Sequence, residues 1–551
     1  MTLLDLIRKE TEGTRRDIVV VAAISAVANG ALLAIVNASV QRGYGAGESL
    51  RTLALFVISF ALYAVCFRRT LFKTTTVLED ILLRIRLRIT EKIREADLAS
   101  LERTNEGEVF TLLTSQARFI SESGTILATA LQSLILLVFA SLYLAYLSLP
   151  AFLFCVALMG LVVPLYTSRL KGATGSMERT VGQEAETFNA IRHLLDGFKE
   201  VKLNRTRAAD VVDDIREQAM RLRELKLRTA DMFNMNYIAA YGGFYAMMGA
   251  VMFVLPHFVS LDHADLVKVM MTVMFIIGPL SMVISGVQAL SKANVAVANM
   301  TRLEEQLDQA IRTLPRAASP VPVPTDFRRL RLEAVGFRYL DRDGATAFSI
   351  GPVDLEIRRG EIVFVMGGNG SGKTTLIKVL TGLYLASSGR ILVDDVEITL
   401  AELPAYHELF SAVFSDFYLF PKLYGLRDVD PDRVRAMLRK FGLAGKTDYV
   451  DGQFTNLDLS TGQRKRLAMI VALLEDRPVY IFDEWAAEQD PQFRRYYYEE
   501  LLPELSRAGK TILAVTHDDR YMATAHRVVK MELGVIDRID EHRRFGEEPT
   551  G

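Results

Sequence analysis

A glycine-rich loop contains the residues whose types and spacing most clearly point to chemistry. Gly367 is followed after four residues by Gly372, Lys373 and Thr374, which fits the GxxxxGK[ST] spacing of a Walker A loop. In such a loop backbone amides cradle phosphates, the lysine reaches the β and γ oxygens, and the hydroxyl ligates magnesium. The predicted nucleotide-binding residues are Gly367, Gly368, Asn369, Gly370, Ser371, Gly372, Lys373, Thr374 and Thr375.

An acidic pair, Asp483 and Glu484, follows the apolar run 479–482 further along the chain. A hydrophobic strand that ends in an aspartate is the arrangement that magnesium coordination requires beside a Walker A loop. Thr374 and Asp483 are therefore the predicted Mg²⁺ ligands, with ATP as the nucleotide.

Residues 459–463, between the loop and the acidic pair, read LSTGQ and resemble the LSGGQ signature of ATP-binding cassette (ABC) proteins. The resemblance implies that the signature of one cassette closes over the ATP held by the loop of another. Ser460, Thr461, Gly462 and Gln463 would then contact nucleotide. Because the chain carries one copy of each motif, it is expected to act with a second chain, as a homodimer or a heterodimer.

The same resemblance implies roles for four further residues. Glu484 would polarise the attacking water, His517 would contact the γ-phosphate, Tyr339 would stack on adenine, and Asp490 would end the loop that joins the two sites. The alternatives are an ordinary surface acid for Glu484, a structural histidine for His517 and an exposed strand tyrosine for Tyr339.

One position departs from the family pattern. Ser415 stands where the family usually has a glutamine that senses magnesium and contacts the membrane domain. Serine is too short to span the same distance to the ion. Either Asp416 or water substitutes, or the communication differs in detail, and no catalytic role is assigned to Ser415.

The elements that must position these residues divide the chain into a membrane part and a soluble part. Of the 551 residues 50% are hydrophobic, and the mean hydropathy is +0.19. Because a helix of roughly 20 apolar residues crosses a membrane, six spans are predicted at about 17–40, 51–72, 124–147, 149–168, 232–258 and 266–290. The predicted fold is a six-helix all-α transmembrane domain (1–313, type I ABC exporter-like), a proline-rich linker (314–326) and an α/β P-loop cassette (327–551).

Charge distribution predicts the orientation of this protein in a membrane. Basic residues precede span one and cluster after span two and between spans four and five, while the other loops are poorer in them. By the positive-inside rule both termini and the cassette face the cytoplasm. The resemblance to ABC exporters implies that the membrane is the bacterial inner membrane. The two long cytoplasmic loops are interrupted near 104–107 and 196–197, where short helices are expected, resembling the coupling helices of exporters. A net charge of −1 gives no reason to expect a nucleic-acid partner.

The prediction of the cargo rests on resemblance to one branch of the ABC family. Residues 482–491, FDEWAAEQDP, and the substitution at 414–416 resemble the ABC branch that exports cyclic peptides and peptide siderophores, including pyoverdine-precursor and microcin exporters. Helical spacing in span five also suggests a cavity for such a cargo, with residues across from it on span six. The cavity residues are Tyr237, Tyr241, Phe244, Tyr245, Met248, Ser285 and Gln288. A helix-packing stripe or an interfacial aromatic belt is the alternative.

Two other functions stay open at this point. A lipid or hydrophobic-drug ABC exporter fits the apolar spans, but the peptide-branch residues disfavour it. A membrane ATPase that senses a ligand or gates a channel, without moving solute, would have the same cassette.

Overall fold

The computed structural model of this protein describes residues 2–10, 14–41, 46–103, 106–259, 263–312, 322–340 and 346–542. The chain divides into two compact units. The first comprises Met1–Lys92 and Asn105–Gln306, and the second comprises Ile93–Thr104 and Leu307–Gly551. Most of the predicted linker, residues 314–321, lies outside the described residues, so its conformation stays a prediction.

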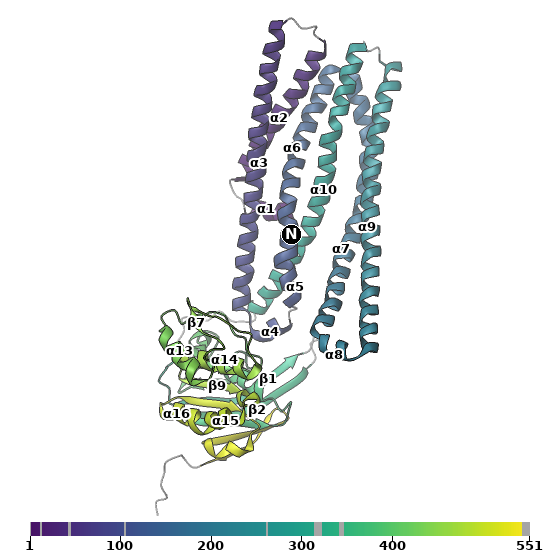
Figure 1. Cartoon of the computed structure of the whole chain (residues 1–551). Helices are drawn as coiled ribbons and strands as arrows, with labels where there is room; N and C mark the ends of the chain where they lie inside the picture. The colour runs from purple at the N-terminus through teal and green to yellow at the C-terminus, as the bar shows by residue number, and fades with distance from the viewer. Residues whose placement is uncertain are drawn as a thin grey trace, which may run out of the picture. The chain divides into compact units, whose positions relative to one another are not determined.

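The first unit is built from long helices that lie alongside one another (Figure 1). Its helices are α1 (Leu3–Glu10), α2 (Thr14–Gln41), α3 (Ala46–Glu95), α5 (Glu106–Thr111), η1 (Leu112–Gln116), α6 (Ala117–Leu147), α7 (Leu149–Asp196), α8 (Phe198–Leu203), α9 (Arg205–Phe253), η2 (Leu255–His257) and α10 (His263–Arg312). Within this unit α7 packs along α9, and α2 packs along α6.

Several of these helices are much longer than a membrane is thick. Helix α3 has 50 residues, which at 1.5 Å per residue is about 75 Å, against a hydrocarbon core of about 30 Å. Among the described residues, five helices are long and apolar enough to cross a membrane. The fourth predicted span, 149–168, lies in α7, where Leu149–Gly160 forms a shorter apolar stretch. The count of six spans therefore stays a prediction.

The second unit is an α/β domain with α4 attached to it. Its helices are α4 (Leu98–Arg103), α11 (Lys373–Leu380), α12 (Leu403–His407), α13 (Pro431–Lys440), α14 (Thr461–Glu475), η3 (Trp485–Glu488), α15 (Pro491–Tyr496), η4 (Tyr497–Leu501), α16 (Leu502–Arg507) and η5 (Asp519–Thr524). Its strands are β1 (Arg329–Leu340), β2 (Thr346–Arg358), β3 (Ile362–Gly367), β4 (Ser388–Val393), β5 (Val396–Glu397), β6 (Phe410–Val413), β7 (Tyr449–Val450), β8 (Gln453–Phe454), β9 (Val479–Asp483), β10 (Thr511–Val515), β11 (Arg527–Glu532) and β12 (Val535–Glu541).

The central sheet of this unit has the strand order β12-β11-β3-β10-β9-β6. Strands β11, β3, β10, β9 and β6 are parallel, and β12 pairs antiparallel at one edge. Alternate residues of β3 enter different cores: Phe364 lies in the core that α14 closes, and Val363 in the core shared with the antiparallel sheet β2-β1-β4-β5. The sheet is therefore covered on both faces, as its nearly continuous apolar strands predict.

Short helices occur near both predicted loop interruptions. Helix α4 precedes the first, and its Leu98 and Ala99 pack against the core of the second unit. Glu102 of α4 accepts hydrogen bonds from Lys378 Nζ at 2.9 Å and Tyr384 Oη at 2.6 Å. Helix α8 follows the second interruption, and none of its residues is buried.

Candidate nucleotide site

Three neighbouring parallel strands bring the candidate residues together. Strand β10 lies between β3 and β9, and Val515 pairs with Val365 on one side and with Asp483 on the other. The glycine-rich loop follows β3, Glu484 follows β9, and His517 follows β10. Since parallel strands end at the same edge of a sheet, residues 150 positions apart in sequence meet there.

The glycine-rich loop joins β3 to α11 and requires its glycines. Gly372 has φ +97°, and a Cβ atom there would lie 2.9 Å from the Ile350 side chain. Lys373 is buried, and its Nζ donates to the carbonyl oxygens of Gly367 at 3.1 Å and Gly368 at 2.9 Å. The lysine thus folds back over the loop, where it would meet the phosphates of a nucleotide.

The predicted metal ligands are also adjacent. Thr374 Oγ1 donates to Asp483 Oδ2 at 3.1 Å, and Asp483 is fully buried. Its Oδ1 has no hydrogen-bond partner in the part of the chain that the structure describes. Burial raises the pKa of Asp483, while the hydrogen bond from Thr374 lowers it. A hydroxyl and a buried carboxylate with a spare oxygen are the hard ligands that Mg²⁺ prefers, so this corner fits the ion.

Ser415 belongs to this corner, although the sequence assigned it no role. Its Oγ donates to Asp483 Oδ2 at 3.2 Å, and this bond also lowers the pKa of that carboxyl group. Serine is too short to replace a glutamine at the ion itself, but it reaches the carboxylate that would hold the ion. In the sequence, the only sign that Ser415 lies near the predicted metal site was its position in the run 414–416.

Glu484 and His517 form a pair at the ends of β9 and β10. The Nε2 of His517 lies 3.1 Å from Oε1 of Glu484, and both side chains are partly open to solvent. The backbone of Glu484 is left-handed, with φ +50° and ψ +33°. A non-glycine residue in this region is uncommon and marks a place where surrounding contacts hold the chain.

The signature residues lie at the start of α14. Ser460 caps this helix, and its backbone N–H donates to Gln463 Oε1 at 3.2 Å. Ser460 and Thr461 are exposed. Within the described residues, no hydrogen bond or ion pair joins 459–463 to the loop 367–375. The signature and the phosphate loop of one chain are thus not parts of one bonded site.

Tyr339 and Asp490 lie at the margins of the site. Tyr339 is partly exposed on β1 and pairs with Phe348 on β2, whose ring reaches to within 3.3 Å of where a Gly372 Cβ would lie. Asp490 caps α15 by accepting from Phe493 N at 2.9 Å and also pairs with Arg466. The Phe493 N–H, followed by Arg466, lowers the pKa of Asp490.

The predicted cavity residues of the first unit have different environments. Phe244 is buried in the helix core and Met248 packs against it, as expected for a packing stripe. Tyr237 and Tyr245 are exposed, and Tyr237 Oη donates to Tyr241 Oη at 2.8 Å. Ser285 and Gln288 on α10 are partly buried. The cavity itself stays a prediction.

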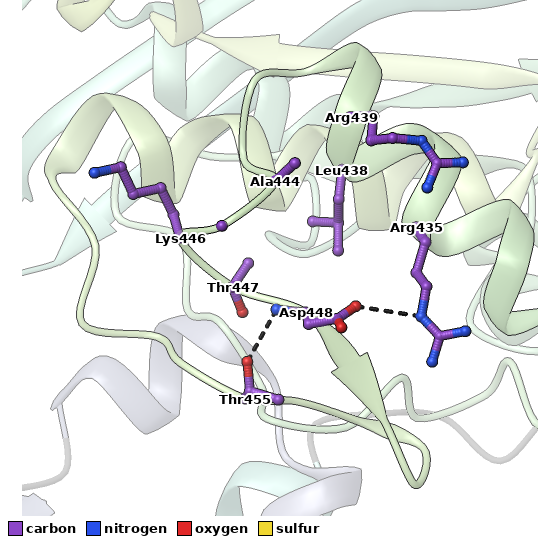
Figure 2. A pocket seen from close by; sticks show the side chains of 9 residues that line it. Arg435, Leu438, Arg439, Ala444, Lys446, Thr447, Asp448 and Thr455 are labelled. Atoms are coloured by element: carbon purple, nitrogen blue, oxygen red, sulfur yellow. Dashed lines mark hydrogen bonds and ion pairs between the residues drawn. The ribbon is translucent and has the colours of Figure 1, made fainter.

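A separate hollow of about 390 Å³ lies in the second unit beside α13. Figure 2 shows Arg435 pointing to Asp448, with Nε to Oδ1 at 3.3 Å, and the backbone of Asp448 bonded to Thr455. None of the predicted nucleotide-site residues lines this hollow. It is therefore distinct from the site at the ends of β3, β9 and β10.

Known proteins resemble this chain over most of its length. Residues 350–487 match the family described as ABC transporter. The ATP-binding protein SyrD of Pseudomonas syringae pv. syringae is 33% identical over 93% of this chain and 92% of its own length. An ATP-dependent lipid A-core flippase of Chromohalobacter salexigens is 26% identical over 70% of this chain and 66% of its own. A solved structure of a bacterial Atm1-family ABC exporter with ATP bound is similar in fold, with TM-score 0.76, 18% identity, and coverage of 97% of this chain and 95% of that one.

Proposed function

Because this chain belongs to the ABC transporter family, as an exporter half-transporter whose cassette hydrolyses ATP with Mg²⁺, we propose that it exports a cyclic peptide or a peptide siderophore. It is an integral membrane protein, with several helices apolar enough to cross a membrane. In our proposal the membrane is the bacterial inner membrane, and the cassette and both termini face the cytoplasm. Two copies of the chain form the transporter.

One observation carries the dimer. Ser460 and Thr461 of the signature, at the head of α14, are exposed, and the signature makes no described bond to the phosphate loop of its own chain. A single chain therefore supplies two incomplete halves of a nucleotide site. A second copy with its cassette reversed would complete both, so that each ATP lies between the loop of one chain and the signature of the other.

The residues divide the work at each site as follows. Lys373 would bind the phosphates, and Thr374 and Asp483 would hold Mg²⁺, which neutralises phosphate charge. Glu484 would accept a proton from the attacking water, and His517, 3.1 Å away, would orient that carboxylate and contact the γ-phosphate. Tyr339 would stack on adenine.

Transport then follows from a difference in affinity between two states. ATP binds best when the cassettes are closed, so its binding energy favours closure and an outward-facing membrane part. Hydrolysis removes the group that joins the cassettes and resets the inward-facing state. The cycle needs no covalent intermediate on the protein.

The peptide cargo is supported by residues of the cassette. The run 482–491 and the serine at 415 resemble the branch that exports cyclic peptides and peptide siderophores. The exposed Tyr237 and Tyr245 on α9 offer aromatic rings with polar ends, which suit an amphipathic peptide.

A lipid is the second candidate cargo. The relatives include lipid A-core flippases, one of them 26% identical over 85% of this chain. A flippase would use the same cassette and the same dimer. The two cargo classes are separated only by a transport measurement.

The dimer is tested with the Glu484→Gln variant of the full-length protein. With ATP and Mg²⁺ this variant should form a stable closed dimer of cassettes, detected by cross-linking or electron microscopy, and its hydrolysis should fall about 10²-fold or more. Failure of ATP to join the cassettes, or hydrolysis at the wild-type rate, would refute the assignment.

The cargo is tested in inverted membrane vesicles. ATP-dependent accumulation of a labelled cyclic peptide or siderophore precursor is expected, and it should be absent with Glu484→Gln. Flux of a labelled lipid but no peptide would support the flippase alternative. Ligand-modulated hydrolysis without any flux would indicate a sensor.

A further inference from the structure

The loop that carries Glu484 is hydrogen-bonded to the signature helix of the same chain. We call residues 484–490 the acidic loop. Lys465 Nζ donates to the Glu484 carbonyl oxygen at 3.0 Å, and Trp485 Nε1 donates to the Lys465 carbonyl oxygen at 2.8 Å. Gln489 Nε2 donates to the Gly462 carbonyl oxygen at 3.1 Å. These three bonds connect both ends of the acidic loop to the first turns of α14.

All three donor side chains are buried. Trp485 is 1% exposed, Lys465 4% and Gln489 5%. A buried lysine is rare unless it is paired, and here its ammonium group also lies 3.7 Å from the Glu488 carboxylate. Water cannot easily replace buried bonds of this kind, so the loop and the helix are held together firmly.

The Lys465 bond acts on the backbone of Glu484 itself. Glu484 is left-handed, a conformation that a glutamate adopts only when its surroundings impose it. Its N–H donates to the Val515 carbonyl oxygen at 3.2 Å on one side, and its carbonyl oxygen receives the Lys465 ammonium group on the other. The same carbonyl oxygen also accepts from the Ala487 N–H at 3.4 Å, and together these bonds hold the backbone from which the Glu484 side chain leaves the sheet.

The far end of the acidic loop is oriented by Arg466. Its Nε donates to Gln489 Oε1 at 2.9 Å, so both ends of the Gln489 amide are bonded. Its guanidinium group lies 3.9 Å from the centre of the Phe493 ring and pairs with Asp490. A leucine or alanine in place of Gln489 or Trp485 would make none of the side-chain hydrogen bonds to α14.

We propose that Lys465 is a positioning residue for Glu484, and that Trp485 and Gln489 make the acidic loop follow its own signature helix. This inference rests on the proposed dimer, in which that signature binds the nucleotide of the partner chain. The carboxylate at one ATP site would then adopt its working position only when the signature of the same chain is engaged at the other site. The arrangement predicts cooperative hydrolysis.

The first test compares Lys465→Met, which keeps the aliphatic stem, with Lys465→Gln, which keeps a shorter donor. In full-length protein in lipid nanodiscs, we expect Lys465→Met to lower kcat for ATP about tenfold or more, because misplacing a reacting group is costly. KM for ATP and closure of the dimer in a Glu484→Gln background should not change. Lys465→Gln should recover part of kcat. Lys440→Met, which removes an exposed lysine paired with Glu504, is the control.

The second test measures the Hill coefficient of hydrolysis for Trp485→Phe and Gln489→Leu. The Hill coefficient of the wild type should exceed 1. In both variants it should fall toward 1, while their affinity for nucleotide stays the same. A wild-type kcat for Lys465→Met would overturn the positioning role, and so would a lower kcat, a higher KM and a lower thermal stability together in both Lys465 variants. An unchanged Hill coefficient in a cooperative wild type would overturn the coupling. If Glu484→Gln never closes a dimer, the proposed function fails instead, and the kcat comparison still decides the Lys465 contact.

Discussion

The Nε2 of His517 lies 3.1 Å from the Oε1 of Glu484, although the two residues are 33 positions apart in sequence. The pairing of β9 with β10 produces this contact, because Glu484 directly follows the last residue of β9 and His517 lies two residues beyond the last residue of β10. One hydrogen bond therefore joins two residues whose roles were predicted separately from the sequence.

Replacing His517 by alanine should slow ATP hydrolysis by about 10²-fold or more, because Glu484 loses the partner that orients it. Binding of ATP should be kept, since Lys373 and the loop are untouched. Steady-state hydrolysis and fluorescent-nucleotide binding measure the two effects. His542→Ala, near the end of β12, is the control, and equal hydrolysis in both variants would contradict the role of His517.

Ser415→Ala should lower the apparent affinity of the ATPase for Mg²⁺. Asp483 would lose the side-chain hydrogen bond from Ser415 and keep the hydrogen bonds from Thr374 and from the Ser415 backbone, and a bond to a charged group contributes about 1.5–3 kcal/mol. The Mg²⁺ concentration at half-maximal hydrolysis should rise severalfold, while the KM for ATP at saturating Mg²⁺ stays the same. A Mg²⁺ titration that is identical to that of the wild type would show that Ser415 is a bystander.

Tyr384→Phe and Glu102→Ala should loosen α4 from the second unit. Glu102 accepts from both Lys378 and Tyr384, and the Tyr384 ring stacks on Phe337 with centroids 4.7 Å apart. Hydrogen exchange of the amides at 98–103 should become faster in both variants. Tyr418→Phe, at an exposed tyrosine, serves as the control. Unchanged exchange would mean that Leu98 and Ala99 hold α4 by packing alone.

In the Asp490→Asn variant, the free energy of unfolding of the cassette should depend less on pH in the acid range. The Phe493 N–H and Arg466 lower the folded-state pKa of Asp490, so its ionised form stabilises the fold above the usual aspartate range. That contribution is lost as the pH falls through the lowered pKa. Chemical denaturation across the acid range should show a smaller decline for Asp490→Asn than for the wild type. Parallel curves for the two proteins would argue against this linkage.

Within the first unit, Phe244→Ala and Tyr245→Ala should behave differently. Phe244 is buried, and removing a buried phenylalanine typically costs about 3–5 kcal/mol. Tyr245 is 57% exposed, so its removal should leave the melting temperature nearly unchanged and alter cargo-stimulated hydrolysis instead. Thermal unfolding in detergent and hydrolysis with added peptide separate the two. A stable Phe244→Ala protein with altered cargo response would assign that residue to the cavity.

The sequence by itself determined the chemistry of the nucleotide site. The loop 367–375, the pair Asp483 and Glu484, and the peptide 459–463 are local patterns whose spacing is set by the ligand, so they can be recognised in one dimension. The apolar stretches inside the long helices were likewise recognisable locally, because the hydrocarbon core sets the minimum apolar length of a span, although the helices themselves extend well beyond it.

Only the tertiary structure decided which of these residues meet. Ser415 reaches Asp483, and Lys465 reaches the Glu484 carbonyl group, because strand order and the packing of α14 place them there. Neither contact has a fixed spacing in sequence. From the sequence, Trp485 indicated only a branch of the family, whereas in the structure its indole N–H donates to a carbonyl oxygen of α14. Burial likewise separated Phe244 from Tyr245, two neighbours that share a helical stripe but point into different surroundings.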